Sequence, residues 1–178
     1  MLIETEIKIK KFKDKTDKIR LVIFDVDGVF TDGSVYLDEK GKEMLRFSRV
    51  DGKGIELLRK NGIKTAVISS EYSEIVKKRM EKLMIDQVYF GIKDKVKVYE
   101  KLKNKYLLND EVICFCGDDI QDLEVIKMAG FSCCPQNAQE EIKKACDYIS
   151  ERFGGNGFVR DVCNMMVEGN SKIKRSEM

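Results

Sequence analysis

The stretch LVIFDVDGVFTDG (residues 21–33) carries a run of apolar residues directly into two aspartates, Asp25 and Asp27, followed by glycine and turn-forming residues. Residues 21–25 have the composition of a buried strand. Two like charges repel each other, and a buried strand gains nothing from them. Either the chain turns into solvent here, or the two carboxylates belong to a site. The rest of the sequence must distinguish these interpretations.

The overall composition is that of one globular domain. The chain has 178 residues, of which 43% are hydrophobic and 36% are charged. Its 33 Lys and Arg against 31 Asp and Glu give a net charge of +2, so we expect neither a nucleic-acid nor a membrane partner. The sequence contains no histidine, which excludes any mechanism that needs an imidazole within one chain.

The cysteine pattern indicates a reducing compartment. None of the six cysteines forms a C-x-x-C pair, and two of them lie in the apolar run EVICFCG (residues 111–117). We therefore predict buried free thiols rather than disulfides or a zinc site. The N-terminus lacks the apolar core of a signal peptide, and no apolar run reaches the length of a membrane span. We expect a cytoplasmic protein.

Apolar runs alternate with helical patterns along the chain. The sequence predicts strands at 21–25, 64–70, 87–91, 111–119 and 131–135, helices at 52–63, 73–85, 95–106, 120–130 and 138–149, and a β-hairpin at 33–48. Ser73 and Asn137 are the expected caps of two helices. Strands separated by helices form βαβ units, so the predicted fold class is α/β, with a doubly wound parallel sheet.

Polar side chains follow the predicted strands where each strand ends. The carboxyl ends of parallel strands lie at one edge of the sheet, so these side chains should meet in one crevice. They are Asp25, Asp27, Ser69, Lys95, Asp118, Asp119 and Asp122. Several carboxylates in one place favour a hard divalent cation such as Mg²⁺, and a lysine and a hydroxyl beside them suit a bound phosphoryl group. The sequence therefore predicts a metal-assisted phosphoryl-transfer site.

The order of these motifs resembles the haloacid dehalogenase superfamily: D-x-D-G-V, then serine, then lysine, then G-D-D-x-x-D. The resemblance implies a Rossmann-like fold in which Asp25 is the nucleophile that forms an aspartyl-phosphate and Asp27 is the general acid and base. It also implies that Ser69 and Lys95 hold the transferring oxygens. Asp25, the backbone carbonyl of Asp27, and Asp118 would bind Mg²⁺, with Asp119 in support and Asp122 orienting Lys95.

Two spacings exclude a cap domain. Ser69 follows Asp27 by 42 positions, and Lys95 follows Ser69 by 26. Neither interval can hold an autonomous domain of about 50 residues. We therefore predict a capless chain, with an N-terminal arm at 1–19, the phosphatase domain at 20–165 and a C-terminal tail at 166–178.

Two longer stretches resemble the 3-deoxy-octulosonate 8-phosphate phosphatase family. They are DVDGVFTDGSVYLDEKGKEMLRFSRVDGKGI (25–55) and GGNGFVRDV (154–162). In that family the hairpin mediates a homotetramer, and the second segment lies over the site of a neighbouring subunit. The resemblance thus assigns Gly155 and Arg160 to a neighbour-subunit lid. It also assigns Ser48, Arg49, Asp51, Gly52 and Arg79 to binding of a sugar acid phosphate.

One departure from that family concerns the substrate. The octulosonate enzymes read T-G-R after the second strand, whereas this chain reads SSE, with Glu71 in place of the arginine. The nine-carbon branch of the family has a glutamate there and a lysine on the next helix, and Lys82 lies at the corresponding spot. We therefore expect a nine-carbon, sialic acid-type 9-phosphate as substrate, with the eight-carbon 8-phosphate as the alternative.

Two other functions are compatible with such a chain. Similar modules serve as non-catalytic tetramerisation domains in sialic acid activation, and an open site could also act on a macromolecular phosphate. The presence of Asp25, Asp27, Lys95 and Asp118 favours an enzyme over the first, and the lack of a basic patch disfavours the second.

Overall fold

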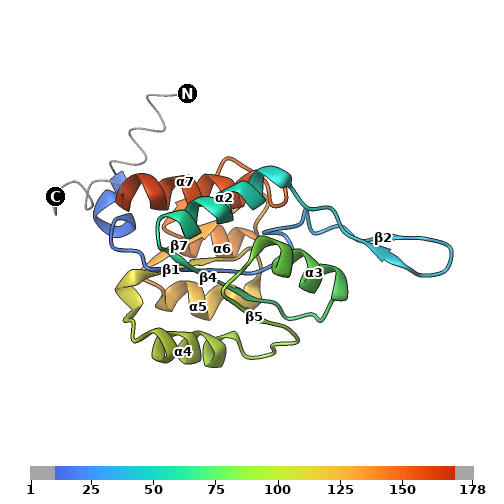
Figure 1. Ribbon diagram of the computed structural model, residues 1–178, viewed down its shortest axis with the longest axis horizontal. Coiled ribbons are helices and arrows are strands. Elements are labelled where there is room, and N and C mark those ends of the chain that lie inside the picture. The colour runs from blue at the N-terminus through green and yellow to red at the C-terminus, as the bar shows by residue number, and fades with distance from the viewer. Residues whose placement is uncertain (1–10, 171–178) are drawn as a thin grey trace.

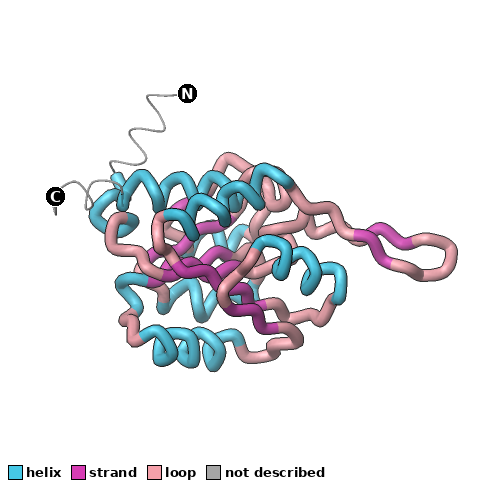
Figure 2. Tube along the Cα trace, viewed as in Figure 1, coloured by secondary structure: helices cyan, strands magenta, loops and turns pink. Residues whose placement is uncertain are grey.

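The structure, a computed structural model, describes residues 11–170 and has an α/β architecture (Figures 1 and 2). Its strands are β1 (Leu21–Phe24), β2 (Tyr36–Leu37), β3 (Glu43–Met44), β4 (Lys64–Ile68), β5 (Gln87–Tyr89), β6 (Ile113–Cys116), β7 (Phe131–Cys134) and β8 (Tyr148–Ile149). Its helices are α2 (Arg49–Lys60), α3 (Glu74–Leu83), α4 (Lys95–Tyr106), α5 (Leu123–Met128), α6 (Glu140–Ala145) and α7 (Phe158–Asn170). Short 3₁₀ turns lie at Asp110–Val112 and Ile120–Asp122, and residues 11–16 are also helical.

The central sheet has six parallel strands in the order β5-β4-β1-β6-β7-β8. β1 lies in the interior of the sheet, paired with β4 on one side and with β6 on the other. Its four residues are all buried, which explains their continuous apolar run, because a parallel strand is covered on both faces. The fold class predicted from the sequence is confirmed.

Helices cover both faces of the sheet (Figure 1). On one face α2, α3 and α7 pack on alternate strand residues, among them Val22, Phe24 and Val67. On the other face α4, α5 and α6 pack on the intervening residues, including Leu21, Ile23 and Ile68. The two clusters alternate along β1 because successive side chains of a strand point to opposite faces.

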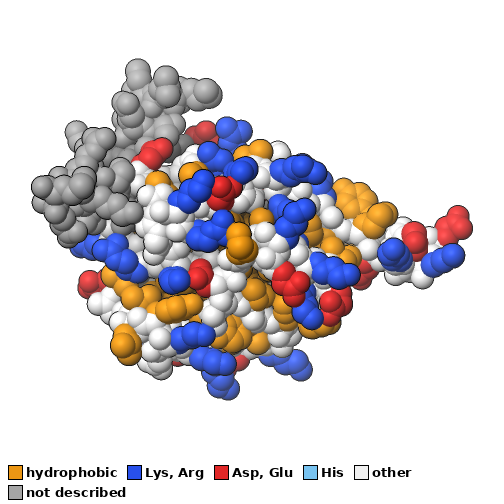
Figure 3. Space-filling view, viewed as in Figure 1, with side chains coloured by type: hydrophobic (Ala, Val, Ile, Leu, Met, Phe, Trp, Pro, Cys, Tyr) orange, Lys and Arg blue, Asp and Glu red, His pale blue; other side chains and the backbone are white. Residues whose placement is uncertain are grey.

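The β2–β3 hairpin projects from this body (Figure 2). It lies in the segment where the sequence predicts a hairpin, although its paired strands have only two residues each. Val35, Leu37 and Met44 are 56%, 65% and 56% exposed. Figure 3 shows apolar side chains gathered at the neck of the hairpin. Such a projecting apolar surface is typical of a contact with another molecule.

The predicted helix at 138–149 is wrong in its second half. α6 ends at Ala145, and Tyr148 and Ile149 instead form β8, which pairs with β7. The cause is a reciprocal contact between Asp147 and Ser132 on β7. The backbone N–H and hydroxyl of Ser132 both donate to the Asp147 carboxylate, and the Asp147 N–H donates to the Ser132 hydroxyl. These bonds draw the chain onto the sheet edge.

The predicted domain boundaries fall within packed parts of the structure. The boundary at 165/166 falls inside α7, where Met165 and Met166 are both buried. In the predicted N-terminal arm, Phe12 packs on the core and Ile19 is fully buried. Residues 1–10 and 171–178 lie outside the described residues. All six cysteines are free thiols, as predicted, and no helix within residues 11–170 is long and apolar enough to cross a membrane.

Candidate active site

The sheet order brings together residues that are far apart in sequence. Asp25 directly follows β1, Ser69 follows β4 on one side, and Gly117 and Asp118 follow β6 on the other. The strand ladders continue into these residues: the Asp25 N–H donates to the Cys116 carbonyl at 2.9 Å, and the Ser69 N–H donates to the Tyr89 carbonyl at 2.9 Å. The backbone of the site is therefore an extension of the sheet.

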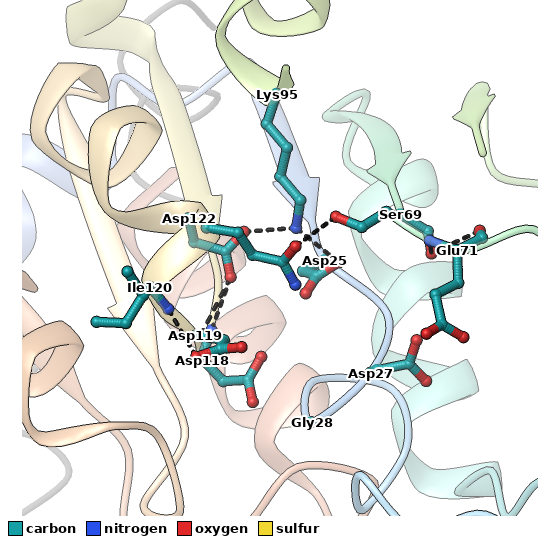
Figure 4. A network of polar contacts seen from close by, with 12 residues as sticks. Asp25, Asp27, Gly28, Ser69, Glu71, Lys95, Asp118, Asp119, Ile120 and Asp122 are labelled. Atoms are coloured by element: carbon teal, nitrogen blue, oxygen red, sulfur yellow. Dashed lines mark hydrogen bonds and ion pairs between the residues drawn. The ribbon is translucent and has the colours of Figure 1, made fainter. Parts of the chain in front are cut away.

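Lys95 reaches this site from the first residue of α4, which Asp94 caps. Its ammonium Nζ lies 3.0 Å from Asp25 Oδ1 and 2.6 Å from Asp122 Oδ1 (Figure 4). All three side chains are buried, with 4% or less of each exposed. Burial lowers the pKa of Lys95, but the two carboxylates offset this and bring the net pKa above its usual value. Lys95 is therefore a cation, and the Asp122 carboxylate contacts its ammonium group.

Asp122 also organises the loop after β6. While its Oδ1 faces Lys95, its Oδ2 accepts backbone N–H bonds from Asp118 and Asp119 at 3.1 and 3.3 Å. Asp119 caps the 3₁₀ turn by accepting from the Ile120 N–H at 2.8 Å. A Cβ on Gly117 would lie 2.5 Å from Asp122 Oδ2, so only glycine allows this close packing. The G-D-D-x-x-D spacing thus builds a compact loop that holds Asp118.

The arrangement of carboxylates fits a divalent cation. Asp25, Asp118 and Asp122 each offer an oxygen, and these oxygens lie within 4.8 Å of one another. Since Lys95 and two amides already engage Asp122, Asp25 and Asp118 are the oxygen donors with capacity for a metal. Among the described residues, Asp118 Oδ1 is buried without a hydrogen-bond partner. A buried carboxylate oxygen without a hydrogen-bond partner is expected of a residue that binds a metal ion.

Electrostatics support the same conclusion. Burial, followed by repulsion from Asp122, raises the pKa of Asp25 to about 7, although Lys95 opposes the change. Burial and the neighbouring charges of Asp25 and Asp122 raise the pKa of Asp118 to about 8. Carboxylates crowded together at this depth resist ionisation unless a cation joins them. A divalent ion between Asp25 and Asp118 would supply that charge.

Asp27 occupies a different environment from Asp25. The Thr31 hydroxyl donates to Asp27 Oδ1 at 3.4 Å and itself accepts from the N–H groups of Gly28 and Gly33. Figure 4 shows the Glu71 carboxylate pointing towards Asp27. Burial and the charge of Glu71 raise the pKa of Asp27 above its usual range. The raised pKa makes Asp27 better suited than an ordinary aspartate to hold a proton and donate it.

A hollow of about 330 Å³ opens beside these residues. The lining includes Asp25, Asp27, Ser69 and Glu71 from the strand ends, together with Gln121 and the hairpin residues Val35, Glu43 and Leu45. Ser69 Oγ donates to the Glu71 carbonyl at 3.0 Å, which fixes the loop between β4 and α3. The hairpin thus forms one wall of the hollow.

Most of the predicted sugar-binding residues lie elsewhere in the described part of the chain. Arg49, Gly52, Arg79 and Lys82 line a separate hollow between α2 and α3, and Ser48 lines a third one near α7. Ser48 is the N-cap of α2, and its carbonyl accepts from Arg79 at 2.9 Å. Of the predicted sugar contacts, Glu71 is the one that lines the hollow beside Asp25.

The prediction for Asp51 is wrong. Its side chain is buried at 1% exposure, and its two oxygens accept backbone N–H bonds from Gly157 at 3.2 Å and Arg160 at 2.9 Å. Asp51 therefore stabilises the beginning of α7, where unpaired N–H groups favour a negative charge. A carboxylate with both oxygens engaged inside the protein is not accessible to a sugar.

The predicted lid residues also have partners within their own chain. Gly155 is buried, and its N–H donates to the Val29 carbonyl at 3.0 Å. Arg160 belongs to α7, and its Nε donates to the Asn164 side chain at 2.8 Å. Gly155 is thus packed against its own loop after β1 instead of reaching outward. A contact of Arg160 with a neighbouring subunit stays a prediction.

The sequence reasoning missed three residues of the site. Thr31 holds Asp27, and Gln121 accepts a hydrogen bond from Ser70 at 2.6 Å across the hollow. Gly28 has a φ of +72°, and a Cβ there would lie 1.9 Å from Asp118 Oδ2. The signal for Gly28 was present in the D-x-D-G pattern, because a glycine directly after a strand-end acid often marks a close approach.

Comparison with known proteins agrees with this geometry. Residues 69–160 match the family model of the haloacid dehalogenase-like hydrolases. The 3-deoxy-D-manno-octulosonate 8-phosphate phosphatase KdsC of Escherichia coli K12 is 31% identical over 163 residues, which cover 92% of this chain and 87% of that protein.

Two solved structures have the same fold. The 3-deoxy-D-manno-octulosonate 8-phosphate phosphatase of Moraxella catarrhalis, solved in complex with a magnesium ion, a phosphate ion and a KDO molecule, has a TM-score of 0.87 and 30% identity, covering 95% of this chain and 99% of that one. The cobalt-bound deoxy-D-mannose-octulosonate 8-phosphate phosphatase of Haemophilus influenzae has a TM-score of 0.84 and 32% identity, covering 89% and 92%.

Proposed function

This chain belongs to the haloacid dehalogenase-like hydrolases, within the family of KdsC, and we propose that it is a Mg²⁺-dependent phosphatase of a 3-deoxy-ulosonate phosphate. The observation that carries the proposal is the convergence of Asp25, Lys95 and Asp118 at the ends of β1 and β6. A lysine paired with a buried aspartate at a strand end is suited to phosphoryl transfer. The lysine can bind the phosphoryl group, and the aspartate can attack it.

In the proposed reaction Asp25 is the nucleophile. One of its oxygens forms a bond to phosphorus while the bond from phosphorus to the sugar oxygen breaks. Asp27 donates its proton to that departing oxygen, which leaves as an alcohol. Asp27 then accepts a proton from water, whose oxygen forms a bond to phosphorus while the bond between phosphorus and the Asp25 oxygen breaks, which releases inorganic phosphate and restores the Asp25 carboxylate. The raised pKa of Asp27 supports the first proton transfer.

The surrounding residues position these groups. Lys95 holds Asp25 and contributes positive charge towards the transferring oxygens, and Ser69 offers a hydroxyl at the next strand end. Asp25, the backbone carbonyl of Asp27, and Asp118 would hold Mg²⁺, with Asp119 in support. When bound, Mg²⁺ supplies positive charge that favours binding of the anionic phosphoryl group.

Two substrate lengths are candidates. The names of the relatives favour the eight-carbon 3-deoxy-octulosonate 8-phosphate. A specific observation favours the nine-carbon, sialic acid-type 9-phosphate: Glu71 lines the hollow beside Asp27, at the position where the resemblance gives the octulosonate enzymes an arginine. An anion at this position would disfavour an acidic group of the substrate placed beside it. Glu71 is therefore the residue that we expect to decide between the two substrates.

A phosphate-release assay tests the proposal. Wild-type protein should release phosphate from the eight- or nine-carbon substrate, lose this activity in EDTA and regain it with Mg²⁺. Asp25→Asn should abolish turnover and leave folding intact, whereas the exposed control Asp14→Asn should leave turnover unchanged. Retained turnover in Asp25→Asn would refute the nucleophile. Glu71→Arg should move the ratio of kcat/KM values towards the eight-carbon substrate.

Assembly and location belong to the same proposal. We assign the exposed apolar hairpin to a homotetramer contact, as the family resemblance implies, and the free buried thiols fit the cytoplasm. A non-catalytic role is disfavoured by the retained Asp25–Lys95–Asp122 contacts, which would serve no purpose in a purely structural module.

A further inference from the structure

A glycine from the far end of the chain lies directly against the active-site loop. Gly154 is buried, and a Cβ built on it would lie 1.7 Å from the Gly28 carbonyl oxygen and 2.9 Å from the Thr31 carbonyl oxygen. Its φ lies outside the left-handed region, so the requirement for glycine at this position is entirely one of space. No other residue type fits here without moving the Gly28 loop.

Gly28 is in turn packed against the proposed metal ligand on its other side. A Cβ on Gly28 would lie 1.9 Å from Asp118 Oδ2. Gly28 is therefore held between Gly154 and Asp118, and it directly follows Asp27, whose carbonyl is a proposed ligand. Any displacement of Gly28 changes the separation between the loop of Asp25 and Asp27 and the loop of Asp118.

Hydrogen bonds close this contact into a ring. The Gly154 N–H donates to Asn137 Oδ1 at 2.9 Å, and the Gln139 N–H, two residues further on, donates to the Asp118 carbonyl at 2.9 Å. The segment after β7 thus contacts Gly154 with one residue and the Asp118 backbone with another. Asn137 is therefore not the cap of α6, whose N-cap is Gln139.

We infer that Asn137 and Gly154 are positioning residues that set the distance between the two metal-binding loops. Mg²⁺ requires short, nearly octahedral oxygen contacts, so a small change in the distance between its two ligand loops weakens binding strongly. Both residues are uncharged, and neither lines the hollow beside Asp25. Their effect should therefore fall on the metal and not on the substrate. This inference rests on the proposed function, because it takes the ion to be Mg²⁺.

The test compares Asn137→Ala and Gly154→Ala in the full chain. A matched control is Gly130→Ala at the opposite end of β7, where a Cβ would overlap the backbone in the same way, 2.6 Å from the Asp110 carbonyl oxygen. Calorimetry measures the Mg²⁺ dissociation constant of the protein without substrate, and thermal unfolding with and without Mg²⁺ measures the same binding independently. Phosphate release gives KM and kcat at saturating Mg²⁺.

We expect Mg²⁺ binding to weaken about tenfold or more in both variants and to stay within twofold in Gly130→Ala. At saturating Mg²⁺ the KM for the sugar phosphate should match the wild type. Folded Asn137→Ala with wild-type Mg²⁺ affinity would overturn the inference, even if Gly154→Ala failed to fold. Equal weakening in Gly130→Ala would overturn it too, since the effect would then be general destabilisation. Wild-type protein that binds no Mg²⁺ would instead refute the proposed function itself.

Discussion

Replacing Lys95 by Met tests whether this lysine is what makes the buried carboxylates tolerable. The substitution keeps most of the aliphatic length and removes the ammonium group, which lies 3.0 Å from Asp25 and 2.6 Å from Asp122. Removing one partner of a buried ion pair costs about 3–5 kcal/mol. With a slope of about 2 kcal/mol per molar urea, the unfolding midpoint should fall by about 2 M. The measurement is urea unfolding in EDTA at pH 8.

The loss should depend on pH in a defined direction. In the wild type the pKa of Asp25 is about 7, raised mainly by burial, and loss of Lys95 would raise it further. Because this pKa lies above the unfolded value of about 3.9, the folded state binds more protons, and stability falls as pH rises through the folded pKa. Above pH 7 the free energy of unfolding of the wild type no longer falls because of Asp25, whereas that of Lys95→Met continues to fall, since its Asp25 has the higher pKa. Its deficit should therefore be larger at pH 8 than at pH 5.

A matched control is Lys97→Met on the same helix. Lys97 pairs with Asp94 at 3.1 Å, but the two side chains are 84% and 48% exposed, so its midpoint should match that of the wild type. Equal deficits of Lys95→Met at pH 5 and pH 8 would refute the electrostatic reasoning. So would a wild-type midpoint for Lys95→Met at pH 8.

Three further changes have defined outcomes. Asp51→Ala should destabilise the protein by about 2–3 kcal/mol in urea, because two N–H groups at the start of α7 lose a charged acceptor; an unchanged midpoint would contradict this role. Thr31→Val removes a hydrogen bond that lowers the pKa of Asp27, so the basic limb of the pH–kcat profile should move to higher pH, whereas Thr31→Ser should leave it in place. Leu37→Asp should dissociate the proposed tetramer in sedimentation, while Lys40→Asp at the tip of the hairpin should not; a monomeric wild type would exclude the tetramer.

The centre of the site could be predicted because local rules determine it. Each of Asp25, Ser69 and Asp118 follows a strand, and parallel strands end at one edge. Lys95 begins the helix that the sequence predicts at 95–106, and Asp94 caps this helix in the structure. Strand ends and helix starts fix these positions, whereas the contact between Lys95 and Asp122 was expected only from the family resemblance.

The errors arose where a long-range contact decides the structure. Nothing near Asp51 indicates that its partners are backbone N–H groups more than a hundred residues later. The segment at 138–149 has helical spacing, and only Ser132 on another strand turns its last residues into β8. The same holds for Gly154: the family resemblance places its segment over a neighbouring subunit, whereas its tight packing is against Gly28 of its own chain.

The ladder bonds that continue past the strands have a consequence for turnover. The Asp25 N–H donates to the Cys116 carbonyl, and the Gly117 N–H donates to the Cys133 carbonyl, so the backbone of the proposed nucleophile cannot move without breaking hydrogen bonds of the sheet. In the proposed reaction the phosphoester would therefore approach a nucleophile whose backbone is fixed. Because Val35, Glu43 and Leu45 of the hairpin segment line one side of the hollow, we expect substitutions there to change the rate of substrate entry or product release more than the rate of bond cleavage.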